Sequence, residues 1–220
     1  MTLNDKAYEQ ILEGLLSGDL APGAMLTESQ VVEQYKLTLA PVRAALQRLS
    51  QEGWLLPQPR RGYRIKPLTI ADTRDLFLMR KLIEPPAARM AAERIDAVRL
   101  RELDAVCALG FEPGDRAGEA AFFAANKAFH LGIAEASGSR RIVETVRILQ
   151  NEAERILRFG MRYLNWSENW NHGHSEMLEA MTEGDGVRAE KVALKQLETS
   201  EDVVMRALML EAEDLPLGVP

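Results

Sequence analysis

The pattern of apolar residues at the start of the chain predicts three short helices. In the first, residues three and four apart recur on one face, namely Ala7, Ile11, Leu12, Leu15 and Leu16. Thr27, followed three residues later by Gln30, forms a capping-box pattern that begins a second helix. Thr38 is expected to cap a third helix, whose apolar stripe consists of Val42, Ala45, Leu46 and Leu49.

Two short strand patterns follow the third helix, which Gly53 is expected to end. The strand candidates are Trp54–Pro57 and Tyr63–Lys66, and a Gln-Pro-Arg-Arg-Gly turn joins them. Three helices followed by a basic hairpin predict a winged helix-turn-helix over residues 1–67. This fold places its third helix in the DNA major groove and its basic loop, the wing, alongside.

The rest of the chain has helical periodicity and no β-type alternation. Six helices are predicted, at about residues 70–94, 97–109, 115–137, 139–163, 167–184 and 186–211. Pro85-Pro86 lies inside the first of them and is expected to kink or split it. The fold class is therefore mostly α, with an N-terminal winged helix-turn-helix followed by an all-α antiparallel helical bundle over residues 68–220.

The net charge of −6 is unevenly distributed along the chain. Between Ala24 and Pro67, seven Lys and Arg residues face three Glu residues, a local charge of +4, so the remainder carries −10. A basic module on an acidic body fits binding to phosphates through one face. The single cysteine, the lack of a secretory signal and the lack of an apolar run of ~20 residues lead us to expect a cytoplasmic protein without a membrane partner.

The third helix and the turn between the strands carry the candidate DNA contacts. These are Thr38, Leu39, Arg43, Gln47, Arg60, Arg61 and Gly62. Arg can donate two hydrogen bonds to a guanine edge, and Gln can pair with adenine. Paired arginines at a tight turn can reach phosphates or the minor groove. The alternative interpretation is a solvated basic helix in a dimerisation module, and Arg48 is expected to make a local ion pair.

These residues and their order resemble the GntR family of bacterial transcription regulators. The matching positions are Leu20-Ala-Pro-Gly23, Leu26, Pro41-Val-Arg-Ala-Ala-Leu46, Leu49, Glu52-Gly53 and Arg61-Gly62. The helical remainder resembles the effector domain of the FadR subfamily, the FCD domain, and six helices resemble its shorter, VanR-like form. In the family, the Arg that matches Arg43 and the wing residues before the Gly contact DNA.

The chain departs from the family pattern at positions that would face DNA. Leu39 and Ser29 stand where the family usually has Arg, and Ala44 stands where it has Glu. Without two cationic contacts, the salt dependence of binding should flatten, and a missing bidentate base contact costs ~1–3 kcal/mol. Alternatively, Leu39 contacts a thymine methyl group and the operator is altered.

The resemblance also implies a ligand site in the bundle. In the metal-binding branch, an Asp, a His four residues later and two further His hold a divalent metal; the matching residues here are Asn126, His130, His174 and Gln196. Zn²⁺ or Ni²⁺ prefers imidazole and carboxylate ligands, so the two amides predict a weakened metal site. The alternatives are a metal-free polar pocket for an organic ligand, and two interior histidines satisfied by hydrogen bonds.

Arg80 is a further candidate ligand-binding residue. In the family, an Arg at this position often lines the pocket and can meet a ligand carboxylate. The alternative is an intrahelical pair with Glu84 one turn later, worth ~0.3–0.5 kcal/mol if exposed.

The sequence thus predicts a homodimeric transcription regulator that binds double-stranded operator DNA, contacting two half-sites with two third helices. The expected mode is repression released by a small organic acid. Two alternatives stay open. One is a helical-bundle metal-dependent hydrolase built around His130 and His174, and the other is a DNA-binding dimer without small-molecule input.

Overall fold

The computed structural model describes residues 2–112, 114–163 and 173–214, and it confirms the mostly α fold class. The chain divides into two compact units, Met1–Thr69 and Ile70–Pro220. No helix among the described residues is both long enough and apolar enough to cross a membrane.

The first unit contains three helices, α1 (Leu3–Leu16), α2 (Glu28–Tyr35) and α3 (Leu39–Gln51). The predicted capping box at α2 is confirmed, because Thr27 Oγ1 accepts from the Gln30 amide while Gln30 Oε1 accepts from the Thr27 amide. Thr38 occupies the predicted N-cap position of α3, but its side chain makes no capping hydrogen bond.

A three-stranded antiparallel sheet completes this unit, with β3 (Gly62–Ile65) between β1 (Met25–Leu26) and β2 (Leu55–Gln58). The two longer strands match the predicted hairpin. The two-residue β1 was not predicted, because so short a segment has no periodicity of its own and exists only through its pairing with β3. Gly62 is required at this pairing: it has φ +94°, and a Cβ there would lie 2.5 Å from the Leu26 carbonyl oxygen.

The core of the first unit lies between α1, α3 and the sheet. The apolar stripes predicted for α1 and α3 are buried there with Leu26, Trp54, Leu55 and Ile65 from the strands. This packing turns the opposite ridge of α3 outward, which is the ridge that carries the candidate DNA contacts.

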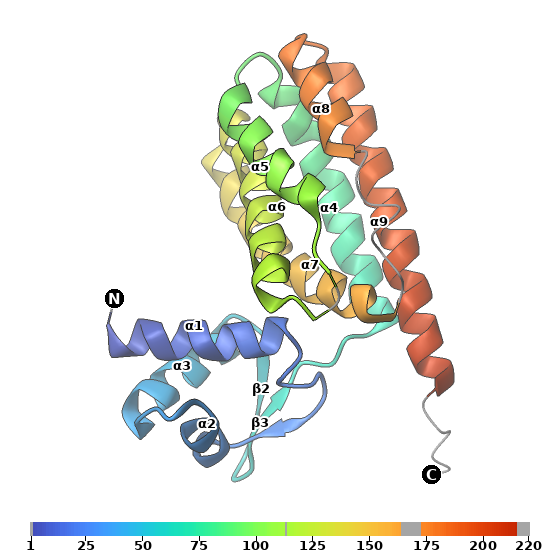
Figure 1. Ribbon diagram of the computed structural model, residues 1–220. Helices are drawn as coiled ribbons and strands as arrows, with labels where there is room; N and C mark the ends of the chain where they lie inside the picture. Colours follow the sequence, from blue (N-terminus) through green and yellow to red (C-terminus); the bar gives the residue numbers. More distant parts are fainter. Residues whose placement is uncertain (1, 113, 164–172, 215–220) are drawn as a thin grey trace. The chain divides into compact units, whose positions relative to one another are not determined.

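The second unit consists of helices packed side by side (Figure 1). They are α4 (Ile70–Ala91), α5 (Ala97–Leu109), α6 (Arg116–Ala136), α7 (Arg140–Tyr163), α8 (Gly173–Thr182) and α9 (Gly186–Asp214). The start predicted for α8, near residue 167, lies outside the described residues. Helix α4 contacts α6, α7, α8 and α9, so several helices of the bundle meet along it.

Helix α4 is not split at Pro85-Pro86, contrary to one of the two expected outcomes. Proline removes a backbone donor, but it does not forbid a helix that tertiary packing holds in place. Ala87, Ala88 and Ala91, directly after the prolines, are buried in the bundle with at most 1% exposure. Their packing keeps the last turns of α4 helical.

Candidate functional site

The candidate DNA contacts on α3 share one exposed ridge. Leu39, Arg43 and Gln47 are spaced four residues apart, which places them one above another along the helix. All three are exposed, Leu39 at 46% and the Arg43 side chain at 61%. Thr38 is exposed just before the ridge. The ridge offers one apolar group, one cation and one amide.

Arg43 is held by a residue that the sequence pattern did not single out. Its Nε donates to Glu28 Oε1 at 3.0 Å and its NH2 donates to Glu28 Oε2 at 2.8 Å, a bidentate pair between α3 and α2. The hydrogen bonds from Arg43 lower the pKa of Glu28 below its usual value. Glu28 is therefore charged at neutral pH and fixes the direction of the guanidinium.

The wing presents two exposed arginines at the turn between β2 and β3. Arg60 and Arg61 are exposed, and Arg60 adopts a left-handed conformation with φ 62°. A non-glycine residue in this region costs of order 1 kcal/mol or more, and such strain clusters at functional turns. The turn thus keeps a long cationic side chain where Gly would be less strained.

Arg48, at the C-terminal end of α3, makes the predicted local ion pair. Its Nε donates to Glu52 Oε1 at 2.9 Å, and its guanidinium lies 3.7 Å from the centre of the Tyr8 ring. The Tyr8 hydroxyl donates to Glu52 Oε2 at 2.6 Å. Arg48 therefore ties the end of α3 to α1.

A buried polar network centred on Glu84 joins three helices of the second unit. Arg80 Nε donates to Glu84 Oε1 at 2.6 Å, so the intrahelical pair is present on α4, and it is buried, with side chains 3% and 8% exposed. Gln150 Nε2 on α7 donates to Glu84 Oε2 at 3.0 Å. His130 Nδ1 on α6 lies 3.3 Å from the same oxygen.

Burial alone would raise the pKa of Glu84, but its partners reverse the direction. The Arg80 charge and the contact with His130 together hold the pKa of Glu84 below its usual value. The group is thus an anion inside the bundle, and its charge is matched by Arg80. The Arg80 NH1 atom is also buried, and it has no hydrogen-bond acceptor among the described residues.

His174 is oriented by a second carboxylate. Its Nδ1 lies 3.3 Å from Asp104 Oδ1, and its ring stacks on Phe129 with centroids 4.0 Å apart. Burial lowers the pKa of His174, and the contact with Asp104 opposes this only in part. The ring is therefore neutral at pH 7, with Nδ1–H directed at Asp104 and the Nε2 lone pair left for another partner.

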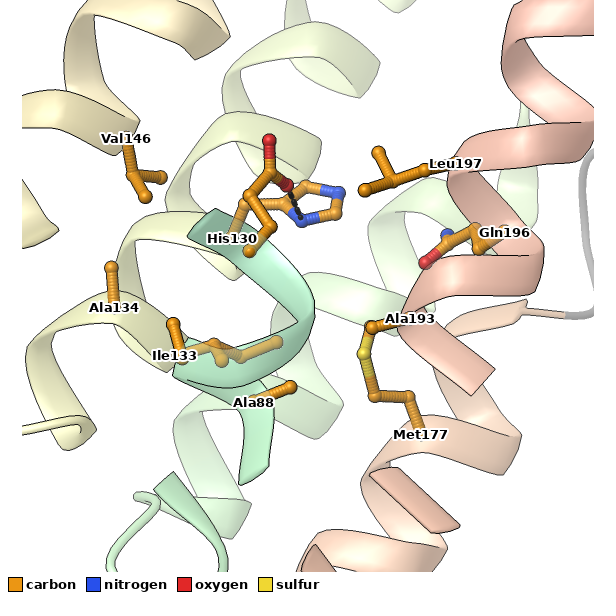
Figure 2. Close-up of a pocket in the computed structure, with 11 residues that line it drawn as sticks. Ala88, His130, Ile133, Ala134, Val146, Met177, Ala193, Gln196 and Leu197 are labelled. Atoms are coloured by element: carbon orange, nitrogen blue, oxygen red, sulfur yellow. Dashed lines mark ion pairs between the residues drawn. The ribbon is translucent and has the colours of Figure 1, made fainter. Parts of the chain in front are cut away.

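A small cavity lies beside the Glu84 network, and two of the predicted ligand residues line it. His130 from α6 and Gln196 from α9 point into it, and the dashed line in Figure 2 marks the contact between His130 and Glu84. Glu84 lines it as well, and the rest of its wall is apolar, including Ile133, Met177 and Leu197. Its volume is about 10 Å³, space for about one water molecule.

The other three predicted ligand residues, Arg80, Asn126 and His174, do not line this cavity. The His174 and His130 rings are nevertheless close, with centroids 5.4 Å apart. Asn126 Oδ1 and His174 Nε2 are both buried without a hydrogen-bond partner in the described part of the chain. Polar atoms buried in this way are uncommon, so these two are candidate hydrogen-bonding groups for a bound ligand.

The donor set falls short of a tight metal site. Each imidazole has its Nδ1 directed at a carboxylate, the arrangement that orients Nε2 toward a metal. However, no cluster of three or more His, Cys, Asp or Glu side chains that could hold a metal ion occurs within residues 2–112, 114–163 and 173–214. Two imidazoles with two neutral amides do not fit a structural or catalytic Zn²⁺ site.

Three residues of these networks were not identified from the sequence. Glu28, Asp104 and Gln150 act through partners that lie 15, 70 and 66 positions away in the chain. A single sequence holds no signal for such distant pairs. Glu84 was identified only because it lies one helical turn from Arg80.

Comparisons with known proteins identify relatives of both units. Residues 3–65 match the bacterial regulatory proteins of the gntR family, and residues 75–199, more than half of the chain, match the FCD domain. The transcriptional regulator LutR of Bacillus subtilis is 30% identical over 215 residues, which cover 86% of this chain and 94% of that protein. The transcriptional repressor RspR of Escherichia coli is 23% identical, covering 91% and 89%.

A solved structure shares the fold. Escherichia coli McbR/YncC matches with a TM-score of 0.78 and 20% identity, over 94% of this chain and 98% of that chain. LutR and RspR are both transcriptional regulators, so the comparisons do not support the hydrolase alternative.

Proposed function

Since this chain is a transcriptional regulator of the GntR family with an FCD domain, we propose that it is a homodimeric repressor released from operator DNA by a small carboxylate. The relative RspR is itself a transcriptional repressor, which supports the proposed sign of regulation. The observation that carries the effector assignment is Arg80, a cation buried in the bundle with one unpaired NH1 donor among the described residues.

The proposed DNA interface consists of the α3 ridge and the wing. Thr38, Leu39, Arg43 and Gln47 face the major groove, while Arg60 and Arg61 at the Gly62 turn bind phosphates or the minor groove. The exposure of these side chains supports the assignment. Replacing Arg61 with Ala should weaken binding to all duplexes uniformly and lower the salt slope by about 0.9 for each phosphate that is no longer neutralised.

The proposed effector is a small carboxylate because Arg80 already binds a carboxylate inside the bundle, that of the Glu84 side chain. Glu84, on the same helix, accepts a hydrogen bond from Arg80 through Oε1. Its Oε2 contacts Gln150 and His130. A ligand carboxylate that took over part of Arg80 would loosen the contacts of Glu84 with α6 and α7. The cavity of about 10 Å³ must enlarge for this, so ligand binding is coupled to a shift of the helices.

We propose that the pocket works without a metal. His130, His174, Asn126 and Gln196 would then hydrogen-bond the organic ligand, with Asn126 Oδ1 and His174 Nε2 as acceptors that lack donors within the described chain. Some FCD domains bind metals and others bind small ligands. A thermal-shift screen of organic acids, with and without Zn²⁺ or Ni²⁺, separates the cases, because a ligand stabilises by RT ln(1 + [L]/Kd). Stabilisation by metal alone would contradict the metal-free pocket.

The homodimer is proposed from the DNA-reading geometry and from an apolar surface on α4. Leu78 and Leu82 lie one turn apart and are 53% and 59% exposed. Such residues on one helix face are suited to a two-fold interface. Light scattering after gel filtration should give twice the chain mass of 24.6 kDa.

Release from DNA tests the proposal directly. A carboxylate that dissociates the wild-type protein from its operator should fail with the Arg80→Lys variant, which keeps the charge but loses the planar fork. Lys81→Met is the matched control, because Lys81 is the neighbouring cation and pairs with Glu201 instead. Unchanged release in Arg80→Lys would remove Arg80 from the effector site, and no release by any acid would favour a regulator without small-molecule input.

A further inference from the structure

The bidentate contact with Glu28 leaves one defined edge of the Arg43 guanidinium available. An arginine side chain has five N–H donors in a planar fork. Glu28 takes the Nε hydrogen and one NH2 hydrogen. One NH1 hydrogen and the second NH2 hydrogen form the end edge of the fork, and neither of them has an acceptor within the described part of the chain. That edge has the spacing that matches guanine O6 and N7.

The position of Glu28 is itself fixed by the fold. Leu26, two residues earlier, is 4% exposed and pairs with Tyr63 in the sheet. Thr27 then closes the capping box that begins α2, and Glu28 is the first residue of this helix. The backbone of Glu28 is therefore fixed by the strand pairing before it and by helix α2 after it. Arg43, by contrast, has a long side chain that would otherwise sample many rotamers.

Glu28 carries an electrostatic penalty for binding DNA. A carboxylate beside the α3 ridge repels phosphates, and its ion pair with Arg43 cancels the charge of that arginine. The same ridge has Leu39 in place of a second cation. A protein that needed only general affinity for DNA would be better served by a neutral residue at position 28. The contact must therefore supply direction rather than attraction.

We infer that Glu28 is a positioning residue for sequence readout, which presents the NH1/NH2 edge of Arg43 to a guanine in the major groove. The inference rests on the proposed function, in which the α3 ridge enters that groove. It makes Glu28 a determinant of specificity and not of affinity. Its removal should strengthen binding to random DNA while it weakens binding to the preferred sequence.

The probe is a duplex selected by the full-length wild-type protein from a random library, compared with a scrambled duplex of equal length. Affinities are measured by fluorescence anisotropy at several salt concentrations, since affinity for DNA depends steeply on salt. Glu28→Gln should bind the scrambled duplex more tightly than wild type. It should bind the selected duplex at least about five-fold more weakly, the lower bound for one bidentate base contact.

Two variants remove the simple charge explanation. Glu28→Asp keeps the charge but shortens the side chain by one carbon. It should therefore lower the affinity for the selected duplex and leave the affinity for the scrambled duplex unchanged. Glu33→Gln, an exposed glutamate of the same helix, makes the same charge change without a contact to Arg43. Glu33→Gln should change the affinities for both duplexes in the same direction. Melting temperatures of all variants establish that they are folded.

The base contact is tested on the DNA side. Each guanine of the selected duplex is replaced in turn with 7-deazaguanine, which lacks the N7 acceptor. At one position this replacement should lower the affinity of the wild-type protein for the duplex. It should not lower the affinity of Glu28→Gln or Arg43→Ala. Tighter binding of Glu28→Gln to both duplexes, as with Glu33→Gln, would overturn the positioning role and leave the proposed function intact. A wild-type protein that selects no duplex would overturn the proposed function, and this inference with it.

Discussion

Replacement of Glu84 with Ala should be among the most destabilising changes in the bundle. The substitution leaves Arg80 charged and 3% exposed without its ion-pair partner, and breaking a buried pair in this way costs ~3–5 kcal/mol. It also deprives Gln150 Nε2 of the acceptor that Glu84 provides, which adds ~1 kcal/mol. The sum is a large fraction of a stability of about 5–15 kcal/mol.

The double variant Arg80→Met, Glu84→Met tests the reasoning. Both charges are removed and similar volume is kept, so its loss of stability should be several kcal/mol smaller than that of Glu84→Ala. Urea unfolding followed by circular dichroism at 222 nm gives the free energies. Glu144→Ala is the matched control, because its pair with Arg140 is exposed and is worth at most ~0.5 kcal/mol. A Glu84→Ala variant that lost less than ~1 kcal/mol, or a double variant worse than the single, would refute the argument.

Three further outcomes are expected. Gly62→Ala should cost about 2 kcal/mol or more, because its Cβ would meet the Leu26 oxygen at positive φ; a melting temperature equal to wild type would contradict this. Thr27→Ala should cost ~1 kcal/mol through the lost cap of α2, again read from thermal unfolding. Burial raises the pKa of Cys107 from about 9 to about 12, so the thiol should resist alkylation at pH 8 until urea unfolds the chain. Because the unfolded thiol ionises first, this group lowers the stability as the pH rises above about 9.

The helices were largely predictable because their signals are local. The capping box at Thr27, the apolar stripe of α3 and the glycine turns each act within a few residues, and the structure confirms the elements they predict. The exceptions have a common cause. Strand β1 exists through its partner β3, and α4 continues through Pro85-Pro86 because it packs against other helices. Tertiary contacts decided both, and the periodicity of one chain does not contain them.

The candidate site was predictable only in its residue types. The spacing of Asn126 and His130, and the resemblance that adds His174, located polar side chains inside the bundle, where the structure buries all three. The sequence did not reveal that Glu84 and Asp104 orient the two histidines. Those contacts depend on how α4, α5, α6 and α8 pack, and neither carboxylate differs in its sequence neighbourhood from the exposed ones.

The pairing of Leu26 with Tyr63 links the wing to the reading helix in a mechanical sense. Tyr63 follows the Gly62 turn of the wing. Leu26 lies two residues before Glu28, whose carboxylate accepts hydrogen bonds from Arg43. If the wing binds the phosphate backbone as proposed, its displacement should be transmitted through the pairing of β1 with β3 and the N-cap of α2 to the guanidinium on α3. Backbone contacts and base contacts of this regulator should then be non-additive. A change of operator preference can arise from substitutions in the wing that never touch a base.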